Sequence, residues 1–180
     1  VGEHSGRYMN LVHPLTEQGY AVVGYDHLGC GQSEGQRGHI NSWEDFSCCL
    51  GICLQMVHDQ FPDLPVFLYG HSMGSLIVLD YVQQSPPGLQ GLILSGTALE
   101  TGGATSPWKI VLAKLLSRLW PNFSLELGLD TKGLSRDPQV VQAYEADPLV
   151  QGKVSTRWGT EMMDAQARTA QYPERVQLPV

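Results

Sequence analysis

Residues 65–75 read Pro-Val-Phe-Leu-Tyr-Gly-His-Ser-Met-Gly-Ser. A short apolar run, Val66 to Tyr69, leads into a Gly-x-Ser-x-Gly motif centred on Ser72, and a run of helical character, Leu76 to Val82, follows directly. Strand, sharp turn and helix in this order are typical of a nucleophile elbow, where a strained turn holds a serine hydroxyl clear of the sheet. The stretch therefore predicts Ser72 as a catalytic nucleophile.

A second Gly-x-Ser-x-Gly match, residues 31–35, contains Ser33. No apolar run enters this match and no helical run leaves it, and the further glycines Gly29 and Gly38 mark the region as a loop. Because an elbow requires strand and helix on its two sides, the context favours Ser72 over Ser33.

A serine hydroxyl needs an imidazole base and a carboxylate that orients it, and in this architecture both follow the serine along the chain. None of the six histidines follows Ser72. His71 is adjacent, but consecutive residues in a tight turn point in different directions, so we predict that it steadies the elbow by packing. The triad acid and base are expected beyond Val180, and the 180 residues alone are expected to be inactive.

Both ends of the sequence indicate an incomplete domain. The chain opens on Val1-Gly2-Glu3 with no leading strand, and an apolar strand begins near Leu178. We therefore expect an internal fragment, truncated at both ends.

Composition favours a soluble globular domain and excludes several classes of protein. A chain of 180 residues that is 42% hydrophobic can bury one sizeable core. No apolar stretch reaches the roughly 18 residues that span a bilayer. The net charge of −7, without a basic block, argues against nucleic acid as a partner.

The cysteines predict a reducing compartment. Cys49 and Cys53 lie four positions apart on an expected helix, so a metal site is conceivable, but such a site needs further ligands nearby. Buried free thiols are the favoured interpretation for these two, for Cys30 and for Cys48. We expect no metal ion, no organic cofactor and a cytoplasmic location.

Short strands alternate with helices in the first half of the chain, which predicts βαβ units and a parallel sheet. The helices are expected over residues 7–18, 42–61 (capped by Ser42) and 76–82, and the strands over residues 21–25, 66–69 and 89–95.

The alternation stops after Leu99. We expect no strand between Thr101 and Pro173, only helical pieces, the first of which runs from Trp108 to Trp120 and is largely apolar. Such a helix either packs on the core or faces lipid as a lid, and periodicity alone does not separate the two. The expected domains are a partial α/β core (1–100), a helical cap (101–172) and the start of the next core strand (173–180).

Several motifs in order resemble the monoacylglycerol lipase and lysophospholipase group of α/β-hydrolases. They are residues 1–8 (VGEHSGRY), 26–35 (DHLGCGQSEG) and 70–74 (GHSMG), joined in the cap by residues 121–125 and 147–149. The resemblance runs over nearly the whole chain. It implies an α/β-hydrolase fold, a mostly parallel sheet flanked by helices with a helical cap insertion. It also implies serine hydrolysis of a carboxylic ester that carries one long acyl chain and a small polar head.

The resemblance also implies roles for particular residues. The backbone N–H groups of Val1 and Met73 are the expected oxyanion donors. Glu3, Arg7 and Tyr144 correspond to positions at the polar-head end of the pocket. For Glu3 and Arg7 a local ion pair is an equal alternative, since charges four residues apart pair readily on a helix.

Other positions in the shared motifs are expected to shape loops. His4 fixes its loop by hydrogen bonding, and Asp26 and Ser33 satisfy backbone groups of theirs. Two positions depart from the group: Cys30 stands where a histidine is usual, and Ser75 where a glycine is frequent. Cys30 is expected to cost the loop a polar contact.

The function expected from these features is hydrolysis of a lipid or other small ester, with transient contact of the cap with a membrane surface. The alternatives are a carboxylesterase or amidase of the same fold, or a non-catalytic member that binds an acyl ligand. An Asp and a His downstream of Val180 favour the enzyme, and their absence favours the binder. The sequence leaves the oligomeric state open.

Overall fold

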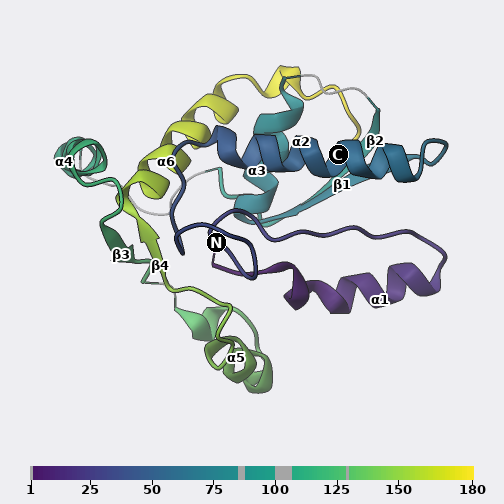
Figure 1. The fold of residues 1–180 in the computed structure, drawn as a ribbon, viewed down its shortest axis with the longest axis horizontal. Helices are drawn as coiled ribbons and strands as arrows, with labels where there is room; N and C mark the ends of the chain where they lie inside the picture. Colours follow the sequence, from purple (N-terminus) through teal and green to yellow (C-terminus); the bar gives the residue numbers. More distant parts are fainter. Residues whose placement is uncertain (1, 85–87, 100–106, 129) are drawn as a thin grey trace.

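The computed structural model describes residues 2–84, 88–99, 107–128 and 130–180, which form a layered α/β part and a cap that projects from it (Figure 1). The strands are β1 (Val66–His71), β2 (Leu89–Ser95), β3 (Ser124–Glu126) and β4 (Lys153–Ser155). The α-helices are α1 (Met9–Glu17), α2 (Glu44–Gln60), α3 (Met73–Val82), α4 (Pro107–Leu119), α5 (Pro138–Glu145) and α6 (Thr156–Gln171). Short 3₁₀ turns cover Ser5–Tyr8, Thr131–Gly133 and Pro173–Arg175.

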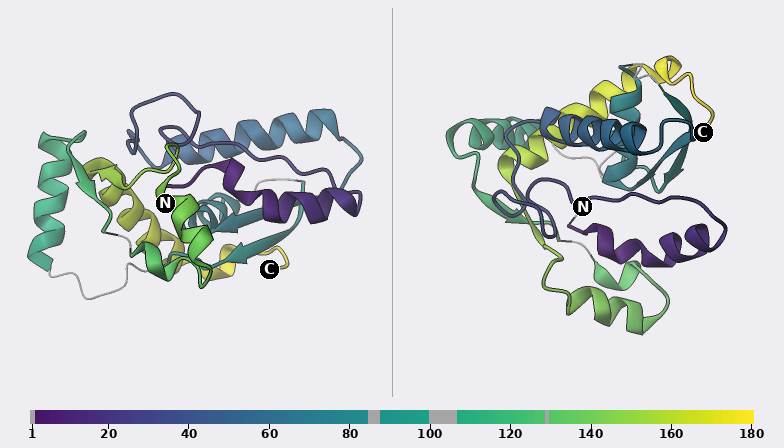
Figure 2. Two further views of the ribbon diagram at one scale, coloured as in Figure 1. Left: turned by 90° about the horizontal axis from the view of Figure 1, so that it is seen from below. Right: turned by 45° about the vertical axis from the view of Figure 1, so that its right-hand side comes forward.

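Strands β1 and β2 pair in parallel, and α3 connects them, so the predicted βαβ unit is confirmed. Their register places Gly70 opposite Leu94 and His71 opposite Ser95. Helices α2 and α3 lie on one side of the two strands and α1 lies on the other (Figures 1 and 2). The carboxyl end of β1 thus runs directly into the elbow.

Aromatic side chains join the α/β part to the last cap helix. The ring of Phe46 in α2 lies edge-on to Trp43 and to Trp158 of α6, with ring centroids 5.1 Å apart in both pairs. All three rings are buried. A two-pronged ion pair between Arg168 and Asp80, with both N–O distances 2.9 Å, fixes α6 against α3. Helix α6 therefore anchors the cap on the core.

The structure corrects two expectations about strands. Residues 21–25 form an extended segment but not a strand (Figure 1). A strand is defined by hydrogen bonds to a neighbouring strand, and within the part of the chain described this segment has no such neighbour. The region expected to be free of strands holds β3 and β4, which pair antiparallel with Leu125 opposite Val154. Strands of three residues are too short to show a period of two in the sequence.

The prediction that Ser42 is the N-cap residue of α2 was also wrong. The helix begins at Glu44, and the side chain of its N-cap residue, Trp43, makes no capping hydrogen bond; Trp43 N–H instead donates to Glu161 Oε2 over 3.0 Å. The Asp45 carboxylate instead accepts hydrogen bonds from the N–H groups of Asn41 and Ser42, 2.8 and 3.3 Å away. An acidic residue in the first turn thus organises the residues that precede the helix.

Helix α4 exposes several of its apolar side chains on the surface of the cap. Val111, Leu115 and Leu119 are 68%, 52% and 74% exposed. Polar contacts hold the helix to α6: Lys114 Nζ lies 2.7 Å from Asp164 Oδ1, and the hydroxyls of Ser117 and Thr160 lie 2.8 Å apart. Within the part of the chain that the structure describes, this face is therefore not packed on the core.

Two expectations at the cap boundaries stay predictions. The core–cap boundary at residues 100–101 lies outside the described residues. Residues 178–180 form no strand in the structure, although Leu92 N–H in β2 donates a 2.8 Å hydrogen bond to the carbonyl of Pro179. Among the helices that the structure describes, none has the length and hydropathy to cross a bilayer.

Candidate functional site

Ser72 occupies a strained turn between β1 and α3. Its φ of 52° and ψ of −118° make it the one non-glycine residue with positive φ among the residues described. This conformation is sparsely populated and persists only where the surroundings impose it. Here Ser72 N–H donates to the carbonyl of Ser95 in β2 over 2.8 Å, and Ser75 N–H donates to the carbonyl of Ser72 over 3.1 Å. The backbone thus has the elbow geometry that the sequence predicts.

The two glycines of the motif play different parts. A Cβ built on Gly70 would lie 2.7 Å from the carbonyl oxygen of Gly74 and 2.8 Å from Ser75 Cα, so strand and helix approach too closely for any side chain. A Cβ on Gly74 would meet nothing within 4 Å of the described residues. The close approach of strand and helix therefore requires a glycine at position 70 but not at position 74.

The hydroxyl of Ser75 joins the elbow to β2. It is fully buried and lies 2.6 Å from the carbonyl of Gly70 and 3.2 Å from that of Ser95, and it accepts from Ser95 N–H over 3.3 Å. A serine at this position therefore adds a bridge between the backbones of β1 and β2 just below Ser72.

We expect Ser75→Ala in the full-length protein to lower the free energy of unfolding by about 1–2 kcal/mol, because it leaves buried backbone groups without the hydroxyl. Urea unfolding followed by circular dichroism measures the change. Ser124→Ala is the matched control, since the hydroxyl of Ser124 is exposed and makes only a 3.4 Å hydrogen bond to Asn122. Equal effects of the two substitutions would contradict the bridge.

The structure describes one of the two expected oxyanion donors, Met73. Met73 is buried and is the first residue of α3. N–H groups in the first turn of a helix have no intrahelical partner and stand at the positive end of its dipole, which favours an anion. Val1 lies outside the described residues.

The three residues expected at the polar-head end come together. Arg7 Nε lies 3.2 Å from Glu3 Oε1, and its guanidinium carbon is 4.9 Å from the ring centroid of Tyr144 in α5. Tyr8 donates a 3.0 Å hydrogen bond to Glu3 Oε2, and burial together with that carboxylate raises the pKa of Tyr8. The local ion pair is present, and it lies within a cluster that spans core and cap.

The glycine-rich loop is built around Asp26. The Asp26 carboxylate accepts hydrogen bonds from the N–H groups of Ser5 and Gln32 over 2.7 and 2.8 Å. The backbone carbonyl of Asp26 accepts from Ser33 Oγ over 2.5 Å. Partial burial opposes ionisation, but the hydrogen bonds outweigh it and lower the pKa of Asp26. The predicted loop roles of Asp26 and Ser33 are confirmed.

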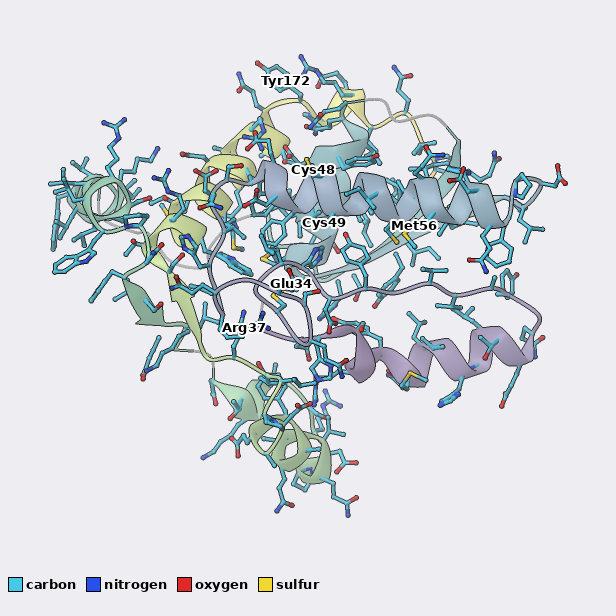
Figure 3. The ribbon with its side chains drawn as sticks, in the orientation of Figure 1. Glu34, Arg37, Cys48, Cys49, Met56 and Tyr172 are labelled. Carbon is cyan, nitrogen blue, oxygen red and sulfur yellow. The ribbon has the colours of Figure 1, made fainter. Side chains whose placement is uncertain are left out.

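Cys30 keeps a polar contact that we expected the loop to lose. Its buried Sγ accepts a 3.5 Å hydrogen bond from Gln151 Nε2 of the cap, and burial raises the pKa of the thiol to about 11. The expectation of buried thiols is wrong for Cys48, which is exposed, while Cys49 and Cys53 are half-buried. All three belong to α2, on which Figure 3 labels Cys48 and Cys49. Within the described ranges, no group of three or more metal-ligating side chains is found.

The prediction that His71 packs at the elbow holds in part. Its side chain is exposed, but its ring lies edge-on to that of Tyr8, with centroids 6.4 Å apart, and its Nδ1 lies 3.2 Å from Ser95 Oγ. The prediction for His4 is confirmed, because His4 Nε2 lies 2.8 Å from Asp147 Oδ2. Asp147 was missed as a site residue, although it belongs to one of the cap motifs behind the family resemblance.

An open groove with a volume of 580 Å³ borders the cluster. Its lining includes residues of β3 and β4 together with Arg37 and Tyr144, and it shares Tyr144 with the cluster. Figure 3 shows Arg37 where the glycine-rich loop faces the cap. The guanidinium is engaged with carbonyls of its own loop, among them those of Ser33 and Gly31, so it shapes the wall of the groove.

A family model described as serine aminopeptidase, S33, matches residues 1–180. The chain belongs to this family. The fold is that of the α/β-hydrolases: the crystal structure of the Paleococcus ferrophilus monoacylglycerol lipase superposes with a TM-score of 0.89 at 37% identity, over 100% of this chain and 68% of that one.

Sequence relatives include two lipases and a phospholipase. The chain is 34% identical to the monoglyceride lipase of Mus musculus over 99% of its own length, and 38% identical to the monoacylglycerol lipase of Mycolicibacterium smegmatis over 82%. It is 33% identical to the phospholipase YtpA of Bacillus subtilis over 91%. It spans 59%, 52% and 62% of these three relatives, respectively.

Proposed function

We propose that the whole protein is a serine hydrolase that cleaves carboxylic esters of lipids, with monoacylglycerols as the first substrate class and lysophospholipids as the second. The observation that carries the proposal is the strained Ser72 elbow in a chain that is 34–38% identical to lipases of monoacylglycerols. The phospholipase relative supports the second substrate class.

In the proposed reaction, Ser72 Oγ attacks the ester carbonyl to form a tetrahedral intermediate, which expels the alcohol and leaves an acyl-enzyme. Water then hydrolyses the acyl-enzyme, releases the fatty acid and restores Ser72. The N–H groups of Met73 and Val1 hold the oxyanion, and loss of one such donor typically costs about 10²–10³ in rate. The base that takes the serine proton, and its carboxylate partner, come from beyond Val180. Serine ester hydrolysis by this route uses no metal ion or organic cofactor.

The polar head of the substrate is assigned to Glu3, Arg7 and Tyr144. A carboxylate can accept hydrogen bonds from glycerol hydroxyls and a guanidinium can donate to them. The Arg7 guanidinium pairs with Glu3 and lies over the Tyr144 ring. The exposed apolar face of α4 suits transient contact with a membrane surface, because apolar patches of this kind mark interaction sites. We assign the protein to the cytoplasm, which its free cysteines favour, with peripheral contact with membranes through α4.

The test is hydrolysis by the full-length protein of a monoacylglycerol, a lysophospholipid, a short p-nitrophenyl ester and an aminoacyl amide. Preference for the two lipids supports the proposal. Turnover of the short ester alone would favour a general carboxylesterase, and turnover of the amide would favour a peptidase of the kind that the family description names. Saturable binding of a fatty acid without turnover of any substrate would favour the non-catalytic member.

A further inference from the structure

Residues 147–151 of the cap, here called the cap segment, contact residues 2–8, here called the lead segment, at several points. The lead segment directly follows Val1, the second expected oxyanion donor, and carries Glu3 and Arg7. We infer that Asp147 is a positioning residue: through His4 it holds the lead segment in the geometry that the reaction needs. This inference rests on the proposed function and goes beyond it.

The Asp147 carboxylate is divided between the two segments. Its Oδ1 accepts a 2.9 Å hydrogen bond from Leu149 N–H and so fixes the turn of the cap segment itself. Its Oδ2 lies 2.8 Å from His4 Nε2 and 3.4 Å from Arg7 Nη1. The hydrogen bond to His4 lowers the pKa of Asp147, so the carboxylate is ionised at neutral pH. One ionised group thus ties the cap to two residues of the lead segment.

A backbone contact lies beside this carboxylate. Gln151 N–H donates to the carbonyl of Gly2 over 2.9 Å. Gly2 has a φ of 84°, and a Cβ on it would lie 2.3 Å from the carbonyl oxygen of Gln151. The two backbones therefore meet with no room for a side chain, one residue after the expected donor.

The contact is shielded enough to control geometry. The side chains of His4 and Asp147 are 12% and 20% exposed, whereas the Lys114–Asp164 pair on the cap surface is 49% and 55% exposed. Exposed pairs contribute little, while charge-assisted hydrogen bonds in partly buried sites fix orientation. A displacement of a reacting group by about 1 Å can lower the rate about 10²-fold. Loosening the lead segment is therefore expected to slow the chemical step.

The experiment is a double-mutant cycle in the full-length protein with His4→Ala, Asp147→Ala and the double variant. We expect each single substitution to lower kcat about tenfold or more, with KM changed less than twofold. We expect the double variant to be no slower than the slower single variant, since the two residues act as a unit. Asp147→Asn keeps one acceptor for Leu149 N–H and turns its NH2 group toward His4 Nε2, which accepts when the ring carries its proton on Nδ1. One hydrogen bond to each partner is thus kept without the charge, and kcat is expected to fall less than in Asp147→Ala. Asp164→Ala is the matched control for loss of a cap carboxylate and is expected to leave kcat unchanged.

Two substrates separate positioning from recognition of the polar head. With a p-nitrophenyl ester, which has no glycerol head, kcat is expected to fall as much as with a monoacylglycerol. A fall confined to the monoacylglycerol, or additive effects in the cycle, would overturn the inference.

Amide hydrogen exchange supplies a readout that does not depend on turnover. Residues 2–8 are expected to exchange faster in Asp147→Ala than in the wild type, while a peptide from α3 keeps its protection. Unchanged exchange in residues 2–8 would refute the inference even if the enzyme is active. If the wild-type protein hydrolyses no ester, the proposed function fails, and the exchange data still decide whether Asp147 holds the lead segment.

Discussion

Replacement of Ser72 by alanine in the full-length protein is expected to abolish ester hydrolysis, with a fall in kcat of about 10⁶-fold. The Oγ atom of Ser72 would form the ester bond of the acyl-enzyme. The strained backbone of Ser72, with a φ of 52°, presents this atom at the end of β1. Hydrolysis of a monoacylglycerol, together with covalent labelling by a fluorophosphonate probe, measures the loss. The unfolding temperature is expected to stay close to that of the wild type.

The control for Ser72→Ala is Ser33→Ala, in the second Gly-x-Ser-x-Gly match. Ser33 Oγ donates to the carbonyl of Asp26 inside its own loop, so fluorophosphonate labelling is expected to persist in this variant. Retention of hydrolysis in Ser72→Ala, or loss of labelling in a folded Ser33→Ala variant, would show that the nucleophile has been assigned wrongly.

Gly70→Ala is expected to cause the largest loss of stability among single substitutions at the elbow. The new Cβ would lie within 2.8 Å of three backbone atoms of Gly74 and Ser75, and backbone cannot move aside as a flexible side chain can. Overpacking of this kind costs about 3 kcal/mol, which corresponds to a fall in Tm of roughly 10 °C for a protein of this class. Thermal unfolding followed by circular dichroism measures the change.

Gly74→Ala is the matched control in the same motif. Its Cβ would meet nothing within 4 Å of the described residues, and the position lies inside α3. Alanine stabilises a helix interior by roughly 0.5–1 kcal/mol relative to glycine, so Tm is expected to stay level or rise slightly. Similar losses in the two variants would mean that the close approach at Gly70 is not what constrains the motif.

Local patterns in the sequence predicted the elbow because its chemistry is contained in a few consecutive residues. An apolar run, a glycine at the crossing and a helical run identify a strand–turn–helix unit without any knowledge of the rest of the chain. The same holds for the glycine-rich loop, whose hydrogen bonds join residues close in the chain. The Asp26 carboxylate accepts from Gln32 N–H six positions on, and Ser33 Oγ donates to the Asp26 carbonyl seven positions back. The short strands β3 and β4 could not be predicted, because strands of three residues are too short to carry a periodic signal.

The sequence by itself determined the candidate nucleophile, the parallel βαβ unit around it and the family resemblance. Only the tertiary structure decided which distant residues support the site: Asp147 meets His4 across 143 positions, and Ser95 meets Ser75 across 20. It also decided that α4 turns its apolar face outward, since periodicity gives the width of an apolar stripe and not what the stripe contacts. Contacts between residues far apart in the chain depend on how the layers pack, and local propensities carry no information about that packing.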